Sequence, residues 1–117
     1  MDNYDKVETD DGITRYTLKG ITHRLDGPAV EWDEGDRWWY RNGLLHREDG
    51  PAIERADGGW EWYRKGKLHR KGGPALRDSS GYSEWHRKGK LHRKDGPAVE
   101  AVLSGYEEWW VDGVRLK

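Results

Sequence analysis

The stretch Leu45-His46-Arg47-Glu48-Asp49-Gly50-Pro51-Ala52 decides the fold, because close copies of it recur along the 117-residue chain at a fixed step. Four copies place a histidine and a proline every 23 residues: His23, His46, His69 and His92, and Pro28, Pro51, Pro74 and Pro97. A fixed period of roughly 20–50 residues is typical of repeat proteins, in which each unit packs only on its neighbours. The sequence therefore predicts a repeat architecture.

Two glycine-containing turn signals in each repeat predict β-hairpins. In the third repeat these signals are Asp57-Gly58 and Lys65-Gly66, and glycine supplies the positive φ that tight hairpin turns require. Folding the chain about both turns places Trp62 on a central strand between Ile53 and His69. The same construction in every repeat predicts a structural ladder of aromatic and histidine side chains: Tyr16, Trp39, Trp62, Trp85 and Trp109 with His23, His46, His69 and His92.

The last repeat is one residue longer than the others. A one-residue bulge there would place Val99 opposite Trp109, and bulges are common near the ends of sheets. Leu116 stands where the other repeats have histidine, as expected of a capping unit.

These patterns predict an all-β protein in which antiparallel hairpin repeats form a single curved sheet. No stretch has a sustained helical periodicity. We expect a single domain over residues 1–117, with approximate units 1–19 (partial), 20–42, 43–65, 66–88, 89–112 and 113–117 (cap).

The composition restricts the functional classes. The chain has 21 Lys and Arg against 22 Asp and Glu, so it lacks the overall positive charge typical of nucleic-acid binding. It has no cysteine, which removes disulfides and thiolate metal sites. The first residues do not resemble a signal peptide, and no segment approaches the length of a membrane span. We therefore expect a cytoplasmic protein that does not interact with membranes.

The segment Trp62-Tyr63-Arg64-Lys65-Gly66-Lys67-Leu68 resembles the core of MORN repeats. The similarity runs from about Val7 to Leu116 and is greatest to the variant found in antitoxin-like and viral proteins. It implies antiparallel hairpins in one curved sheet and a scaffold for binding proteins, and it implies no catalytic residues. The chain departs from standard units because His-Arg-x-Asp-Gly-Pro-Ala replaces their Gly-x-Gly, so a lipid-binding role is not expected.

The recurring histidines and arginines have both structural and functional interpretations. Successive histidines are two strands, or roughly 10 Å, apart, which is too far to share one metal ion. We therefore expect no metal site and no cofactor. Each recurring arginine either pairs with the aspartate two residues later or belongs to an array that recognises phosphate or carboxylate groups. In the third repeat Gly72 replaces that aspartate, and Lys and Arg are concentrated in the third and fourth repeats.

We expect a non-catalytic, protein-binding repeat scaffold, either a viral inhibitor of host defence or an antitoxin-like protein, with the host-cell cytoplasm as its location if viral. Aromatic residues outside the ladder and nearby basic residues are candidates for partner binding: Trp38, Trp60, Trp110, Arg64, Lys67, Arg70, Arg87, Lys90 and Arg93. Self-association is left open. The alternative is a nucleotide- or nucleic-acid-binding module that uses the basic third and fourth repeats.

Overall fold

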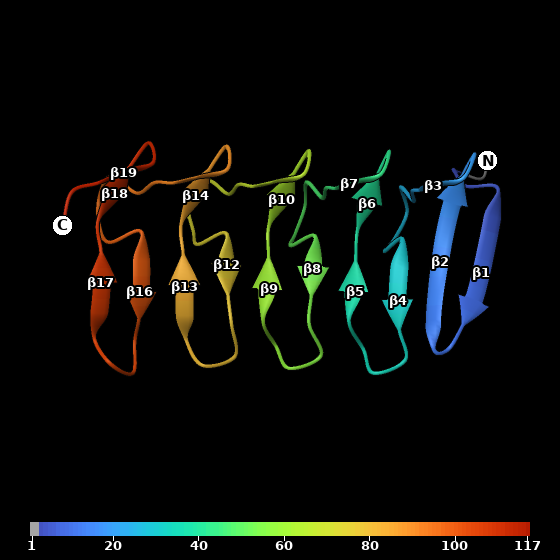
Figure 1. Cartoon of the computed structure of the whole chain (residues 1–117), viewed down its shortest axis with the longest axis horizontal. Helices are drawn as coiled ribbons and strands as arrows, with labels where there is room; N and C mark the ends of the chain where they lie inside the picture. Colours follow the sequence, from blue (N-terminus) through green and yellow to red (C-terminus); the bar gives the residue numbers. More distant parts are fainter. Residues whose placement is uncertain (1–2) are drawn as a thin grey trace.

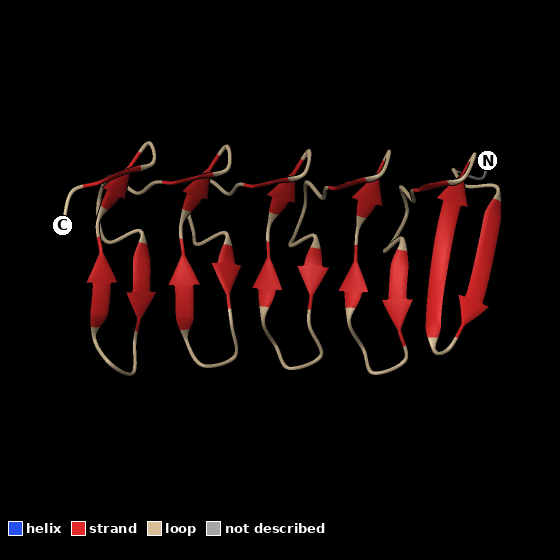
Figure 2. Ribbon diagram, viewed as in Figure 1, coloured by secondary structure: helices blue, strands red, loops and turns tan. Residues whose placement is uncertain are grey.

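The computed structural model describes residues 3–117, which form only strands and turns (Figure 2). This part of the chain measures 48 × 26 × 18 Å and is a ladder of hairpins with the two termini at opposite ends (Figure 1). None of the described residues belongs to a helix long and apolar enough to cross a membrane. The prediction of an all-β stack of antiparallel hairpins is confirmed.

A large antiparallel sheet holds two strands from each repeat. Its order follows the chain: β1 (Lys6–Asp10), β2 (Ile13–Leu18), β4 (Val30–Trp32), β5 (Arg37–Trp38), β8 (Ile53–Glu54), β9 (Trp60–Glu61), β12 (Leu76–Arg77), β13 (Tyr82–Glu84), β16 (Val99–Ala101) and β17 (Tyr106–Glu108). Because neighbouring strands are also neighbours in sequence, each repeat contacts only the repeats beside it.

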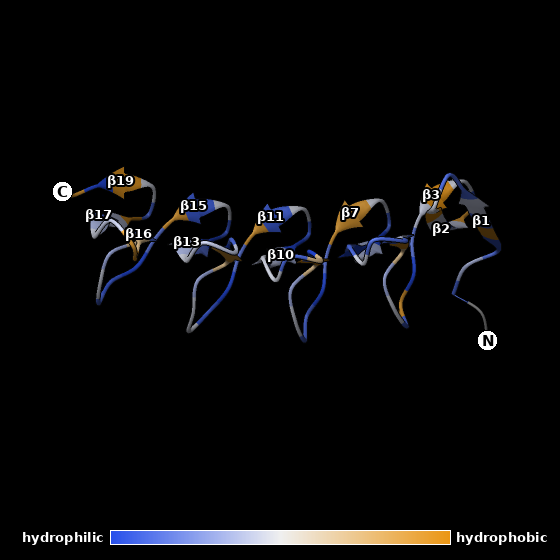
Figure 3. Cartoon of the chain, turned by 90° about the horizontal axis from the view of Figure 1, so that it is seen from below, coloured by the Kyte–Doolittle hydropathy of each residue, from blue (hydrophilic) through white to orange (hydrophobic). Residues whose placement is uncertain are grey.

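A second row of short hairpins lies along one end of the main strands. β3 (Ile21–Thr22) pairs with the end of β2, and four separate hairpins follow: β6 (Tyr40–Arg41) with β7 (Leu44–Leu45), β10 (Tyr63–Arg64) with β11 (Lys67–Leu68), β14 (His86–Arg87) with β15 (Lys90–Leu91), and β18 (Trp110–Val111) with β19 (Val114–Arg115). Viewed along the main strands, these hairpins lie to one side of the sheet (Figure 3).

The short hairpins have the predicted register. Arg64 pairs with Lys67 and Tyr63 with Leu68 about Lys65-Gly66, and the His69 amide donates to the Trp62 carbonyl at 3.0 Å. Lys65 and Gly66 both have positive φ, at 50° and 80°, as a two-residue type I′ turn requires.

The predicted register of the main hairpins is wrong for four of the five rows. Ile53 pairs with Glu61, whereas the prediction placed it opposite Trp62. At Asp57-Gly58 only the glycine has positive φ, and the Arg55 amide donates to the Gly59 carbonyl. This is a longer loop in which a residue with positive φ forms a bulge, and it displaces the pairing by one residue.

The other rows show the same difference between turn types. Val30 pairs with Trp38, Leu76 with Glu84 and Val99 with Glu108, in place of the predicted partners Trp39, Trp85 and Trp109. Only the first hairpin, with positive φ at both Asp11 and Gly12, has the predicted pairing of Val7 with Tyr16. In the other rows the recurring tryptophan therefore lies where the chain bends from the main sheet into the short hairpin.

Candidate binding surface

The recurring aromatic rings stack against the recurring arginines. The guanidinium carbons of Arg24, Arg47, Arg70 and Arg93 lie 4.0, 3.9, 4.1 and 4.0 Å from the ring centres of Tyr16, Trp39, Trp62 and Trp85. At the end of the ladder, Lys117 Nζ lies 4.7 Å from the ring centre of Trp109. We call this row of stacked side chains the Arg–aromatic spine.

A glycine lies close beneath each guanidinium of the spine, where a Cβ atom would displace the arginine. A Cβ atom added to Gly50 would lie 2.8 Å from the guanidinium carbon of Arg47, and the equivalent distance at Gly96 is 2.6 Å. The glycines that precede the four prolines lack positive φ. A positive φ therefore does not explain glycine at these four positions: Gly27, Gly50, Gly73 and Gly96.

Hydrogen bonds hold each spine arginine in place. Arg47 Nη1 donates to the Pro51 carbonyl at 3.1 Å and to Glu54 at 3.1 Å, while its Nε donates to Asp49 at 3.1 Å. Arg24 and Arg93 make the same three kinds of bond. The sequence interpretation anticipated the aspartate partner but missed the glutamate seven residues after each of these three arginines, because its predicted register was displaced.

The recurring histidines join one repeat to the next. Nδ1 of His46 accepts a hydrogen bond from the backbone amide of Lys65, in the turn of the following short hairpin, at 2.9 Å. The same bond recurs at His23, His69 and His92, with the amides of Asn42, Lys88 and Asp112 as donors. Nδ1 must be unprotonated to accept this bond, so these rings serve the repeat interfaces in their neutral form.

Burial and nearby positive charge lower the pKa of His69. Burial is the larger cause, and Arg64 and Arg87 act in the same direction. In the second repeat Glu48 lies 3.2 Å from Nε2 of His46, and the hydrogen bond to this ring holds the pKa of Glu48 below its usual value. Among the described residues, no group of three or more His, Asp or Glu side chains could hold a metal ion.

The other face of the sheet carries a row of glutamate–aromatic pairs. The Tyr63 hydroxyl donates a hydrogen bond to Glu61, and the ring N–H of Trp110 donates one to Glu108 at 2.7 Å. Glu84 accepts a similar bond from His86 at 2.8 Å, and its pKa is lowered chiefly by that bond. The equivalent pair in the second repeat is a stack of Trp38 and Tyr40. We call this row the Glu–aromatic face.

The three aromatic candidates for partner binding do not share one surface. Trp38 pairs across the sheet with Val30 and Ile53, and Trp110 belongs to the Glu–aromatic face. Trp60 lies on the opposite face, where its ring centre is 5.3 Å from the guanidinium carbon of Arg70. All three rings are half-buried, and cross-strand partners point to the same face of a sheet, so only two of them share a side.

The basic candidates fall into two groups. Arg64, Lys67, Arg87 and Lys90 are exposed on the short hairpins β10–β11 and β14–β15. Arg70 and Arg93 are half-buried members of the spine. All of them except Lys90 line grooves between successive repeats.

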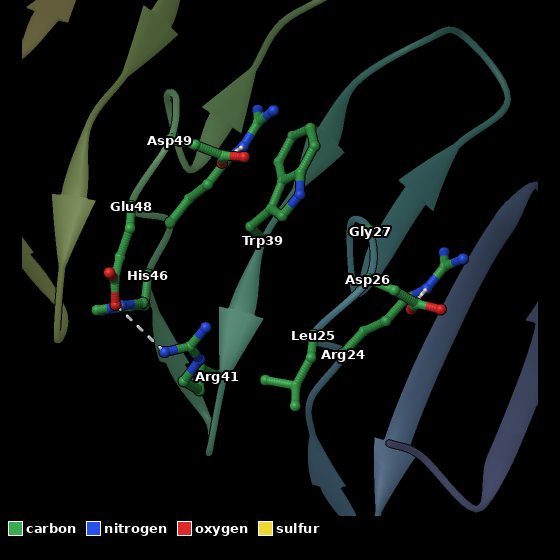
Figure 4. A pocket seen from close by; sticks show the side chains of 10 residues that line it. Arg24, Leu25, Asp26, Gly27, Trp39, Arg41, His46, Glu48 and Asp49 are labelled. Carbon is green, nitrogen blue, oxygen red and sulfur yellow. Dashed lines mark hydrogen bonds and ion pairs between the residues drawn. The ribbon is translucent and has the colours of Figure 1, made fainter. Parts of the chain in front are cut away.

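The first groove, between the first and second repeats, contains equal numbers of arginines and carboxylates (Figure 4). Arg24 and Asp26 line one wall, and Trp39, His46 and Asp49 line the other, with Arg41 and Glu48 bonded at 3.4 Å. The equivalent groove between the second and third repeats retains Glu48 as its carboxylate, beside Arg64 and Lys71. The grooves are thus built from the same recurring arginine, tryptophan and histidine positions, while the charge of the other lining residues changes along the ladder.

Comparisons with protein-family models, with curated proteins and with solved structures gave no significant match, so the resemblance to MORN repeats stays a prediction.

Proposed function

We propose that this protein is a non-catalytic scaffold that binds a protein partner across several repeats. One observation carries the proposal: the recurring histidines and arginines bond within the ladder, whereas the residues at the tips of the short hairpins differ between repeats and are exposed. His46, for example, accepts a bond from the next hairpin at Lys65, and Arg47 donates to the Pro51 carbonyl. At the tip of the short hairpin, Leu44 in the second repeat is replaced by Lys67 in the third.

The shape of the ladder supports recognition of an extended partner. Stacked repeats present long continuous surfaces whose individual units can differ in chemistry, and repeat proteins commonly bind other proteins in this way. Here the equivalent tip residues change from Ile21 and Leu44 to Lys67 and Lys90, and then to Val114. A partner that contacts several tips would meet an ordered series of apolar and basic side chains.

The MORN resemblance suggests the biological setting of this proposal. A viral inhibitor of host defence and an antitoxin-like protein would each act by binding a protein, and both would do so in the cytoplasm.

The test is an affinity capture from the native host followed by mass spectrometry. We compare the wild-type protein with a Lys67→Glu, Lys90→Glu variant and with a matched Lys6→Glu, Lys19→Glu control in the first repeat. A protein that the wild type and the control retain, and that the tip variant loses, supports the proposal. Retention of no protein by the wild type after cross-linking contradicts it.

A second candidate function is nucleic-acid binding, favoured by the local concentration of basic residues. Of the chain's 21 Lys and Arg residues, eleven lie between residues 64 and 94, with only Asp78 and Glu84 as acidic residues there. A salt titration distinguishes the two functions, because phosphate contacts make affinity fall steeply with salt. Sub-micromolar, steeply salt-dependent binding of DNA or RNA would replace the protein scaffold with this candidate.

A further inference from the structure

The third repeat contains a spine arginine from which both carboxylate partners are missing. Arg24, Arg47 and Arg93 each bond to an aspartate and to a glutamate of their own repeat. At Arg70, Gly72 replaces the aspartate and Arg77 replaces the glutamate. Among residues 3–117, the Arg70 side chain has one hydrogen bond, from Nη1 to the Pro74 carbonyl at 3.2 Å, which leaves its Nε and Nη2 groups without a partner.

The Arg70 guanidinium is nevertheless held in the same position as its equivalents. It stacks on Trp62 at 4.1 Å, and a Cβ added to Gly73 would lie 2.8 Å from its central carbon, as at Gly50 beneath Arg47. Trp60 adds a second ring at 5.3 Å. Burial lowers the pKa of Arg70 from the usual value of arginine, which is the effect expected of a half-buried cation without a counterion.

Arg70 lines a groove that is rich in positive charge. The groove has a volume of about 340 Å³ and lies between the third and fourth repeats; its lining includes Arg70, Trp85, Arg87, Arg93 and Lys94, with Asp95 as the one acidic residue. Asp95 is already bonded to Arg93 Nε at 3.2 Å. The equivalent first groove balances three carboxylates, from Asp26, Glu48 and Asp49, with three arginines, so it has no excess of positive charge.

We propose that this groove binds carboxylate groups of an acidic protein segment, with Arg70 as the central contact. The chemistry of the other repeats identifies the ligand: wherever the chain supplies the missing groups itself, it supplies one Asp and one Glu carboxylate. The Arg70 guanidinium is held by a ring and a backbone carbonyl. It can therefore donate hydrogen bonds to carboxylates of another molecule while its side chain loses little further conformational entropy. The acidic segment would belong to the partner of the proposed function, on which this inference rests.

A short acidic peptide tests the site without the partner. The probe is an acetylated, amidated Gly-Asp-Gly-Glu-Gly peptide, and binding is followed by NMR of the arginine Nε–Hε groups, with the Arg70 signal assigned by its loss in Arg70→Lys. We expect the Arg70 signal to shift saturably as the peptide is added. Arg77→Glu, which restores the pairing of the other repeats, should weaken the binding about tenfold or more, since a charge-assisted hydrogen bond contributes at least this much.

Matched variants separate the site from general electrostatics. Arg37→Glu makes the same change of charge in β5 and should alter the affinity less than about twofold, because exposed charges at a distance are screened. Asp49→Gly with Glu54→Arg removes both carboxylates from Arg47 and should create a second peptide-sensitive arginine signal. Thermal melts of all variants confirm that each is folded at the temperature of the titration.

Three results would overturn the proposal: no saturable shift of Arg70, equal weakening by Arg77→Glu and Arg37→Glu, or binding of an oligonucleotide at Arg70 more tightly than the peptide. A negative peptide titration leaves the scaffold function standing if affinity capture succeeds with the Arg77→Glu variant. If only the affinity capture fails, the peptide titration still tests the Arg70 site, because it does not require the partner.

Discussion

The second and third repeats share a frame and differ in how its arginine is neutralised. Arg47 and Arg70 both stack on a tryptophan, lie above a glycine and bond to a proline carbonyl. Arg47 has Asp49 and Glu54 in addition, whereas Gly72 and Arg77 stand at the equivalent positions beside Arg70. The comparison shows that the ring, the glycine and the carbonyl are the contacts common to both repeats. The two carboxylates can be replaced by other residues without a change in the backbone path.

The largest expected effect is the loss of a spine ring, and it should be the same in both repeats. Trp39→Ala and Trp62→Ala each remove a large packed surface and an arginine stack, so we expect each to lower the free energy of unfolding by about 3 kcal/mol. Urea denaturation measures both. A cost below about 1 kcal/mol in either repeat would show that the ring is not part of the shared frame.

The glycines should distinguish the repeats. Gly50→Ala and Gly73→Ala each bring a Cβ to 2.8 Å from the guanidinium carbon. Arg47 is fixed by its carboxylates and cannot move without losing them, so we expect Gly50→Ala to cost about 2 kcal/mol. Arg70 would break only its bond to the Pro74 carbonyl on shifting, so Gly73→Ala should cost about 1 kcal/mol less. Equal costs in urea denaturation would mean that the carboxylates do not restrain the guanidinium.

The third repeat should also be sensitive to acid through His69. Its pKa is lowered in the folded protein, so the unfolded chain binds a proton at a higher pH than the folded one. The stability contributed by the neutral ring is complete above the unfolded pKa of about 6.5 and is lost as the pH falls toward the lowered folded value. His69→Asn retains an acceptor without titrating and should reduce this loss between pH 7.5 and 5.5 in denaturation experiments. An unchanged pH profile in the variant would contradict the assignment.

The smallest expected effect is a gain in stability from Arg77→Glu. The new carboxylate would reach Arg70 as Glu54 reaches Arg47, at 3.1 Å. Because the pair is partly exposed, we expect a gain of at most about 1 kcal/mol. Glu54→Gln in the second repeat is the converse control and should show a loss of similar size. A lower melting temperature for Arg77→Glu would indicate that the third repeat does not reproduce the geometry of the second.

The repeat period and the short hairpins could be predicted from sequence because they depend on local turn chemistry. Lys65-Gly66 and its equivalents adopt the two-residue turn that such a pair favours. Asp57-Gly58 was misassigned because an Asp-Gly pair also fits a longer turn with a bulge, in which only Gly58 has positive φ. The sequence does not distinguish the two turns, and the difference displaces the register by one residue.

The candidate surface was less predictable than the fold because it depends on side chains that meet across that displaced register. The recurrence of arginine with an aromatic residue at the same step was visible in the sequence, but their stacking follows from the bend at Trp39 and its equivalents. The division of Trp38 and Trp60 between two faces follows from strand alternation, because Trp38 is equivalent by the repeat step to Glu61, the neighbour of Trp60. The replacement of Asp by Gly72 was visible, whereas the second replacement, Arg77, had no meaning until Glu54 was seen to contact Arg47.

The bonds from each histidine to the following hairpin have a consequence for local motion. An interior repeat such as the third is bonded on both sides, through Lys65 to His46 and through His69 to Lys88. Within residues 3–117, the first and the last repeat each have a neighbour on one side only. Opening an interior unit therefore breaks two interfaces at once, whereas a terminal unit can open by breaking one. Amide hydrogen exchange should accordingly be slowest in the middle of the ladder and faster toward both ends. The basic groove, between the third and fourth repeats, would then lie in the part of the molecule that opens least often.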